Sequence, residues 1–265
     1  MNKKDLKLKY LYDFLETFWY APCDALLRSV EAVIISKATI LSPSLDVGCG
    51  DGRISKLLFG KRIIDIGVDP GKKEASLAAK SGVYKSVLAL DAASLPFKDG
   101  HFRTIIVNST FEHIKHDKQV LKELSRVTKK GGIIYLTVPS DKYLKLLKSL
   151  GLNGARLKNF NIRVAHYHYR TKEDWEKMLS QVGLKATEMQ YYFPKQLAKM
   201  WLLLFRLTTF KVYRRELWSY LKDSPYGKLV PKNLVIYFLK RFISPAYRLS
   251  FEEGGGLLYI KAVKK

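Results

Sequence analysis

Acidic residues stand in or just after three successive stretches that have the sequence pattern of buried strands. These stretches are either continuously apolar or alternate between apolar and polar residues. Asp46 and Asp51 flank the glycine-rich turn of "LDVGCGDGR" at 45–53, Asp69 ends "IDIGVD", and Asp91 ends "VLALD". Glycine-rich turns after strands often hold phosphates at the N-terminus of the next helix, and carboxylates there would repel a phosphate. The same carboxylates favour a positively charged ligand. The sequence therefore predicts a cationic, phosphate-free ligand at the ends of these strands.

The turn departs from the dinucleotide-binding pattern at one position. Gly48 and Gly50 fit the first two glycines of G-x-G-x-x-G, but Arg53 stands at the third. Asp69 lies about twenty residues after the glycines, where a carboxylate accepts hydrogen bonds from ribose hydroxyls. Asp91 is placed to accept from an adenine amino group. Each acid taken alone could instead be a helix N-cap or a turn residue.

The elements that must position these side chains follow an alternating order. Strands and helices that alternate predict parallel βαβ units and a doubly wound α/β sheet, with ligands at the carboxyl ends of the strands. The predicted strands lie at 44–47, 63–68, 84–90, 103–108, 132–138, 184–193 and 256–263. The predicted helices lie at 52–59, 72–81, 117–128, 140–149 and 172–181.

Two further segments do not follow this order. Residues 1–43 predict an N-terminal helical cap of two helices broken near Pro22, rich in aromatic residues that could cover the ligand. Residues 194–254 predict a basic, aromatic helical insertion that precedes the last strand. The ligand-binding domain then comprises 44–193 and 255–265.

Taken together, these motifs resemble the class I S-adenosylmethionine-dependent methyltransferases, in their small-molecule (Methyltransf_11) branch. The resemblance rests on five stretches: "LDVGCGDG" at 45–52, "GVDP" at 67–70, "DAASLPFKDGHFRTIIVNSTFEHI" at 91–114, "VLKELSRVTKKGGIIYLTVPS" at 120–140 and "HYHYRTKEDWEKMLSQVGLK" at 166–185. It implies a Rossmann-like seven-stranded sheet whose last strand runs antiparallel, and S-adenosyl-L-methionine as cofactor.

The resemblance also implies roles for individual residues. The methionine part of the cofactor would meet the first strand and its turn, the ribose the end of the second strand, and the adenine the end of the third. The implied cofactor-binding residues are Asp46, Gly48, Cys49, Gly50, Asp69, Pro70, Asp91, Ala92 and Asn108. Asn108 would line the pocket near the methyl donor.

Residues after the fourth strand could perform the chemistry of transfer. Methyl transfer to oxygen or nitrogen requires an aligned nucleophile and, for a hydroxyl, removal of its proton. In "NSTFEHI", His113 could act as base and Glu112 could orient it or bind substrate; alternatively both are local helix caps. His166, His168 and Tyr169 are expected to contact substrate or to pack in a loop. No third ligand at useful spacing accompanies the two histidines, so no metal is expected.

The net charge and the cysteine content indicate which partners and which cellular compartment the protein is expected to have. The chain has 265 residues, 47 Lys and Arg against 24 Asp and Glu, and a formal net charge of +23. A field of that sign attracts nucleic acid, anionic lipid headgroups or phosphorylated substrates. Free Cys23 and Cys49 fit a reducing, cytoplasmic compartment. The longest apolar run, "MWLLLF" at 200–205, is far too short to span a bilayer, so any membrane attachment is expected to be peripheral, on the inner face.

The predicted function is methyl transfer from S-adenosylmethionine to an oxygen or nitrogen atom. The predicted acceptor is a small molecule or a lipid-linked or glycan precursor. Aliphatic blocks in 194–254 favour an anionic membrane surface over RNA as a partner. An RNA methyltransferase and a non-catalytic S-adenosylmethionine-binding domain are the alternatives, and the oligomeric state is left unassigned.

Overall fold

A computed structural model describes residues 3–249 and 254–265, which fall into two compact units. The sheet unit comprises Ile35–Tyr192 and Gly254–Lys265. The helical unit comprises the described residues of Met1–Ile34 and Phe193–Glu253. We describe each unit by itself.

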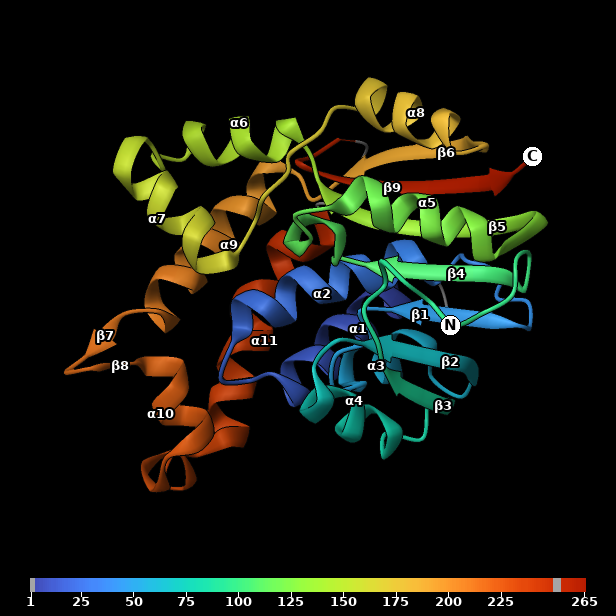
Figure 1. The fold of residues 1–265 in the computed structure, drawn as a ribbon. Coiled ribbons are helices and arrows are strands. Elements are labelled where there is room, and N and C mark those ends of the chain that lie inside the picture. The colour runs from blue at the N-terminus through green and yellow to red at the C-terminus, as the bar shows by residue number, and fades with distance from the viewer. Residues whose placement is uncertain (1–2, 250–253) are drawn as a thin grey trace. The chain divides into compact units, whose positions relative to one another are not determined.

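Among the described residues, the sheet unit is built on seven strands (Figure 1). Their order is β3-β2-β1-β4-β5-β9-β6, and β9 runs antiparallel to both of its neighbours while the other pairs are parallel. This arrangement confirms the predicted doubly wound sheet with its antiparallel last strand. The strands are β1 (Ser44–Val47), β2 (Ile64–Asp69), β3 (Tyr84–Ala89), β4 (Phe102–Asn108), β5 (Thr128–Pro139), β6 (Leu184–Tyr192) and β9 (Leu257–Lys264).

The central strands form because both of their faces are covered. All four residues of β1 are buried, and so are most residues of β4 and β5. Strands buried on both faces read as continuous apolar runs, which is how they stand in the sequence. Leu45, Ile105, Ile134 and Leu258 from four different strands share one core with Trp175.

Helices follow the strands and are visible around the sheet in Figure 1. On α5, Val120, Leu121, Leu124 and Val127 form the buried face, which explains its strong sequence periodicity. The helices of this unit are α3 (Arg53–Phe59), α4 (Lys72–Ala79), η1 (Phe111–His113), α5 (Asp117–Val127), α6 (Asp141–Ser149), α7 (Gly154–Val164) and α8 (Lys172–Gln181).

Helix α7 is not among the predicted elements. Its sequence does place Leu157, Phe160 and Val164 at helical spacing, so this helix was overlooked although it has the apolar periodicity of the others; of these three residues Phe160 is buried. It ends at Ala165, which adopts a left-handed conformation with φ of 51°. That turn leads the chain into the histidine-containing segment 166–169.

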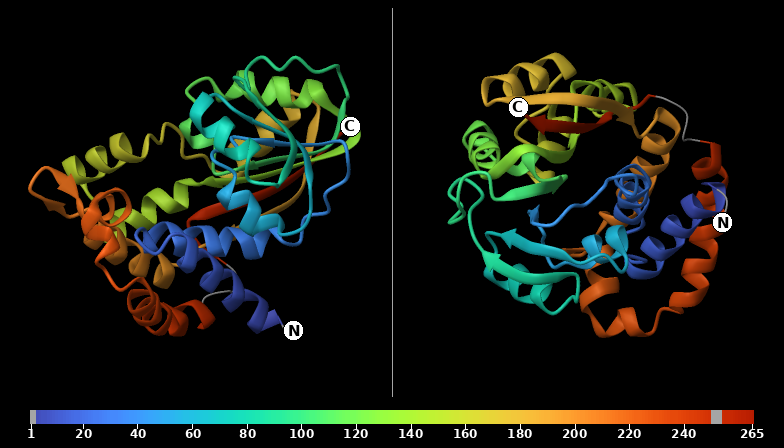
Figure 2. Two further views of the ribbon diagram at one scale, coloured as in Figure 1. Left: turned by 90° about the horizontal axis from the view of Figure 1, so that it is seen from below. Right: turned by 90° about the vertical axis from the view of Figure 1, so that its right-hand side faces the viewer.

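The helical unit joins the two segments that the sequence analysis treats as a cap and an insertion. It contains α1 (Lys3–Thr17), α2 (Pro22–Ile35), α9 (Lys195–Thr208), β7 (Lys211–Val212), β8 (Arg215–Glu216), α10 (Leu217–Asp223), η2 (Pro225–Lys228) and α11 (Lys232–Leu249). Helix α1 lies beside α11, as Figures 1 and 2 show.

Polar contacts join distant parts of this unit. Lys240 Nζ lies 2.7 Å from Glu16 Oε1. On α2 and α9, Cys23 Sγ lies 3.7 Å from Thr208 Oγ1. The side chains of Leu11, Phe14 and Leu15 on α1 are fully buried. The N-terminal helices and the helices after β6 therefore bury apolar side chains against each other, so the two segments form one compact unit. No described helix has both the length and the apolar character required to cross a bilayer.

Candidate functional site

The glycine turn lies at the carboxyl end of β1, where α3 begins (Figure 1). Gly48, Gly50 and Gly52 have φ values of 73°, 54° and 78°, which L side chains rarely adopt. The backbone N–H groups of Gly48 and Cys49 both donate to the carbonyl of Val68 on β2. The turn is thus a fixed backbone structure attached to the neighbouring strand.

Asp69, the last residue of β2, holds the turn from the other side. Its Oδ2 accepts a hydrogen bond from the Gly50 N–H at 2.9 Å, and its Oδ1 accepts from the Gly71 N–H at 2.9 Å. Each carboxylate oxygen can accept a further hydrogen bond. Asp69 therefore joins the first two strand ends and can still receive ligand hydroxyls.

The glycines leave the backbone of the turn accessible on one side and tightly packed on the other. A Cβ added to Gly50 would meet no heavy atom within 4 Å. A Cβ added to Gly48 would lie 3.1 Å from the Thr110 Cβ and would overlap the tip of that side chain. The turn therefore fits a ligand that approaches the backbone closely at Gly50, and it tolerates no side chain at Gly48.

Asp46 is buried beneath the turn and is hydrogen-bonded within the protein. Its Oδ2 accepts from Ser55 Oγ at 2.7 Å and from Tyr84 Oη at 2.6 Å, and the residue is 3% exposed. Burial raises the pKa of Asp46, against the two donated hydrogen bonds that lower it. Burial likewise raises the pKa of Tyr84, which therefore stays a donor. No local pattern in the sequence indicated Ser55 or Tyr84 as partners of Asp46.

This burial makes a prediction about stability. A carboxyl whose pKa is raised on folding binds its proton more readily in the folded state, so its ionisation costs stability as the pH rises above its ordinary value of 3.8. The variant Asp46→Asn lacks this cost. We therefore expect Asp46→Asn to become more stable relative to the wild type between pH 4 and pH 8, seen in urea titrations as a growing difference between its free energy of unfolding and that of the wild type.

A matched variant on β2 gives the opposite slope. For Asp65, hydrogen bonds from Lys85, Ser42 and Ser44 outweigh desolvation and lower the pKa to about 2. The stabilisation from Asp65 is present above pH 4 and is lost as the pH falls towards 2, so Asp65→Asn removes stability above pH 4. Equal slopes for the two variants would contradict this account of Asp46.

Asp51, the other acid of the turn, is engaged locally. Its Oδ1 accepts from the Arg53 N–H at 3.0 Å, and its Oδ2 accepts from Arg53 Nε at 2.7 Å. The residue at the third glycine position thus neutralises the second acid. Asp51 behaves as a turn residue, whereas Asp69 links the turn to the end of β2 and Asp46 is buried beneath it.

The remaining residues predicted to bind the cofactor lie at or just after strand ends. Asp91 follows β3, is exposed, and accepts from the Ala93 N–H at 2.9 Å. Ala92 is buried and Pro70 is exposed. The thiol of Cys49 is buried, which raises its pKa.

Asn108 ends β4 and turns the chain towards the second cluster of the site. Its Oδ1 accepts from Thr137 Oγ1 of β5 at 2.8 Å. Ser109 follows with a positive φ of 46°, and Thr110 Oγ1 donates to the Asn108 carbonyl at 3.1 Å. Thr110 Oγ1 also lies 3.3 Å from the Val47 carbonyl of β1, so residues 108–110 are held against both β1 and β5.

Glu112, His113 and His166 form the second cluster. One nitrogen or carboxylate oxygen from each lies within 4.8 Å of the others, although 53 residues separate the two histidines in the chain. Glu112 is 4% exposed, and the rings of His113 and His166 are 5.2 Å apart between centroids. The structure thus brings together two candidates for catalysis and one for substrate binding.

The other two residues predicted to contact substrate have contacts within the protein. His168 Nε2 lies 3.1 Å from the Ile114 carbonyl and 3.7 Å from Asp117 Oδ1. Tyr169 Oη donates to Asn161 Oδ1 at 2.8 Å. Both side chains therefore help to fix the segment that carries His166.

A hollow adjoins this cluster between α6 and α7. Its volume is about 670 Å³, and His166 and Tyr167 are part of its wall. Lys148 and Lys158 add positive charge, and Leu157 and Ile162 add apolar surface. Sequence reasoning missed Leu157, Lys158 and Ile162 because α7 was not predicted, and it missed Lys148 because the neighbour that α6 faces was unknown.

The fold is shared with methyltransferases of known structure. An S-adenosylmethionine-dependent methyltransferase from Thermotoga maritima superposes with a TM-score of 0.58 at 18% identity, covering 96% of this chain and 100% of that one. Geranyl diphosphate C-methyltransferase from Streptomyces coelicolor, in complex with Mg²⁺, geranyl diphosphate and S-adenosyl-L-homocysteine, gives 0.55 at 14% identity, covering 89% and 77%. At these identities the likeness concerns the fold.

Sequence relatives match parts of this chain. An uncharacterised protein of Methanocaldococcus jannaschii is 36% identical over 38% of this chain and 46% of its own. Chloroplastic tocopherol O-methyltransferase of Arabidopsis thaliana is 37% identical over 35% of this chain and 28% of its own length. Ubiquinone biosynthesis O-methyltransferase of Rhizobium etli is 23% identical over 60% of this chain and 66% of its own length.

The chain spans less than half the length of the first two of these relatives. Residues 45–136, from β1 to β5, match the model of the family described as methyltransferase domain (Methyltransf_11). With the strand order and the turn described above, this match identifies residues 45–136 as a methyltransferase domain of the Methyltransf_11 type, within a fold that is shared with S-adenosylmethionine-dependent methyltransferases.

Proposed function

We propose that this protein transfers a methyl group from S-adenosylmethionine to an oxygen or nitrogen atom of a small-molecule or lipid-linked acceptor. The observation that carries the proposal is the turn at Gly48 and Gly50, held by the Asp69 carboxylate at the ends of β1 and β2. This arrangement suits a nucleoside with a cationic tail better than a diphosphate.

Each cofactor-binding residue has a role that agrees with its position. Asp69 binds the ribose hydroxyls, and Asp91 with Ala92 binds the adenine. The backbone at Gly50 receives the methionine part, and buried Asp46 supplies negative potential beneath it. When bound, S-adenosylmethionine supplies its methyl group as an electrophile on a positively charged sulfur.

The acceptor site is the hollow beside His166. Lys148 and Lys158 favour an acceptor with a phosphate or carboxylate, and Leu157 and Ile162 favour one with apolar carbons. His113 Nδ1 lies 3.2 Å from the Ala165 carbonyl, and a carbonyl can only accept. Nδ1 therefore carries the proton, and Nε2 has the lone pair with which His113 removes a proton from an acceptor hydroxyl.

Calorimetry and a transfer assay together test this function. We expect S-adenosylmethionine and its demethylated product to bind at one site per chain, with no binding of NADH. We expect tritiated methyl groups to enter the lipid or glycan fraction of cells more than the RNA fraction. Binding of NADH in place of S-adenosylmethionine would contradict the proposal, and cofactor binding without any transfer would favour a non-catalytic domain.

We further propose that the helical unit binds an anionic membrane surface. On α11, Leu234, Tyr237, Phe238 and Phe242 are each more than half exposed and recur at intervals of three and four residues. They form a stripe along one side of the helix. The other side of α11 is buried, as the 0% exposure of Tyr247 shows.

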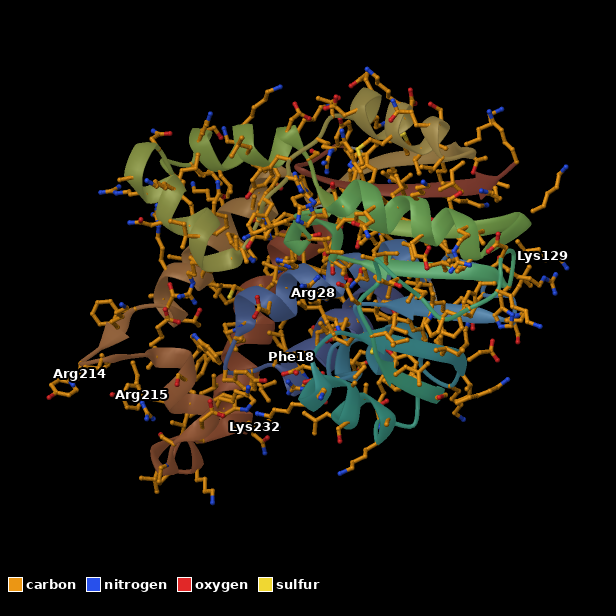
Figure 3. All side chains as sticks on the ribbon, in the orientation of Figure 1. Phe18, Arg28, Lys129, Arg214, Arg215 and Lys232 are labelled. Carbon is orange, nitrogen blue, oxygen red and sulfur yellow. The ribbon has the colours of Figure 1, made fainter. Side chains whose placement is uncertain are left out.

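Basic side chains accompany the exposed apolar ones. A hollow of about 390 Å³ beside the stripe is lined by Lys240, Arg241 and Arg248. In the β7–β8 hairpin, Arg214 lies at the tip and Arg215 begins β8, as Figure 3 shows. Interfacial helices combine such an apolar face with basic residues that attract anionic lipids. An aliphatic and aromatic stripe of this kind exceeds what base stacking in RNA requires.

Vesicle sedimentation tests the membrane proposal. We expect the protein to pellet with phosphatidylglycerol vesicles at low salt, and much less with phosphatidylcholine vesicles. Replacing Tyr237, Phe238 and Phe242 together with serine should abolish pelleting. The matched control replaces exposed Ile63 and Leu77 of the sheet unit with serine and should pellet as the wild type does. Indifference to vesicles with steeply salt-dependent RNA binding would support an RNA methyltransferase instead.

A further inference from the structure

We propose that Glu112, His113 and His166 bind a divalent transition-metal ion such as Zn²⁺. Two imidazoles and one carboxylate are a ligand set suited to first-row divalent ions. Because the three donor atoms lie within 4.8 Å of one another, they can surround one ion. Donors about 2.1 Å from a tetrahedral ion lie about 3.4 Å apart, so the cluster must contract. His113 is exposed and His166 half-buried, so their rings have room to turn.

Hydrogen bonds fix His166 in the form that a metal requires. Tyr169 Oη gives its single proton to Asn161 Oδ1 at 2.8 Å, so it can only accept from His166 Nδ1, which lies 3.0 Å away. His166 Nδ1 therefore carries a proton, and the lone pair is on Nε2. Metal-binding histidines are commonly oriented by such a bond from their other ring nitrogen.

His113 is fixed in the same form. Its Nδ1 faces the Ala165 carbonyl at 3.2 Å, which again places the lone pair on Nε2. Both histidines thus have the same tautomer, although they come from distant segments. With the rings 5.2 Å apart beside a buried carboxylate, both Nε2 atoms can therefore act as donors to one shared cation.

The backbone holds the two segments together. The Tyr167 N–H donates to the Glu112 carbonyl at 2.8 Å, and the His166 N–H donates to the Asn161 carbonyl at 3.1 Å. Beneath them, the rings of Phe111 and Trp175 pack edge to face. The ligand positions therefore do not depend on a mobile loop, as a precise metal site requires.

The position of the proposed metal site beside the hollow suggests a role for the ion in methyl transfer. Three protein ligands leave a position for an oxygen of the molecule in the adjoining hollow, whose wall includes His166. This part of the inference rests on the proposed function: a metal-bound hydroxyl loses its proton to water more readily, so the ion would do what is otherwise assigned to His113.

Metal titration of the purified full chain, stripped with chelator and without S-adenosylmethionine, tests the site. We expect one Zn²⁺ per chain by calorimetry, an upward shift in Tm on adding Zn²⁺, and visible absorption bands with Co²⁺. His113→Gln and His166→Gln should each weaken Zn²⁺ binding by at least about 100-fold and remove the Co²⁺ bands. The matched control His116→Gln, which changes a nearby exposed histidine, should bind as the wild type does.

The outcomes separate this inference from the proposed function. Zn²⁺ binding that is unchanged in both His113→Gln and His166→Gln would overturn the site, and so would the absence of binding by a folded wild-type chain. Methyl transfer by such a metal-free chain would leave the function standing with His113 as base. Stoichiometric Zn²⁺ at these residues without S-adenosylmethionine binding would retain the metal site and contradict the function.

Discussion

Replacing Gly48 with alanine is expected to weaken S-adenosylmethionine binding by at least about 100-fold, the equivalent of about 3 kcal/mol. The new Cβ would overlap the side chain of Thr110, and the φ of 73° is itself strained for alanine. Thr110 Oγ1 is bonded to the Asn108 carbonyl, so relieving the overlap moves the segment after β4 as well as the turn. Calorimetry with the cofactor measures the effect.

Gly60→Ala is the matched control for this variant. Gly60 has a φ of 61°, but a Cβ there would meet no heavy atom within 4 Å. It ends α3, away from the ligand side of the turn. We expect a loss of stability of about 1 kcal/mol from backbone strain, with cofactor affinity retained. If both variants lost affinity equally, strain alone would explain the result and the role given to the Gly48–Thr110 contact would be wrong.

Asp69→Asn is expected to have a comparable effect for an electrostatic reason. The two oxygens of Asp69 accept from the N–H groups of Gly50 and Gly71, and an amide can replace only one of these acceptors. The other N–H would face the amide's own donor, and a ribose hydroxyl would lose a charged acceptor. Each loss is worth about 1–3 kcal/mol. Cofactor affinity should therefore fall by about 100-fold or more.

Asp65→Asn is the control on the same strand. Asp65 Oδ2 also accepts from a backbone N–H, that of Ser44 at 2.8 Å, but it lies near the opposite end of β2. This variant should lose stability while binding the cofactor as the wild type does. An Asp69→Asn protein with wild-type affinity would remove Asp69 from the binding site.

The fold and the first half of the site could be predicted from the sequence because their signals are local. Strands buried on both faces read as apolar runs, and the residues that follow them occupy the ligand edge of a parallel sheet. Asp69 and Asn108 are the last residues of β2 and β4, as this reasoning requires. Glycine is the residue type that adopts positive φ most readily, so the glycines themselves indicated a turn of this kind, and the structure has positive φ at these positions.

The second half depends on contacts between residues that are distant in sequence. The hydrogen bond from Tyr84 to Asp46 requires the register of three adjacent strands, which no local pattern reveals. His113 meets His166 only because the chain returns after α7, a helix that is not among the predicted elements, and no local pattern reveals where that return leads. Spacing along the chain therefore pointed to His166 and His168 as a pair, whereas the structure pairs His166 with His113.

The position of β9 has a consequence for how this chain can change. Tyr192 at the end of β6 is paired with Leu257 at the start of β9, so the intervening residues leave and re-enter the sheet about 5 Å apart. In terms of sheet topology, residues 193–256 are a long connection between two adjacent antiparallel strands. Its length and content can change without altering a strand register, provided that it still covers the apolar faces of α1 and α2. A property carried by this connection, such as the proposed membrane attachment, can thus diverge while the hollow beside His166 and the turn at Gly48 are inherited unchanged.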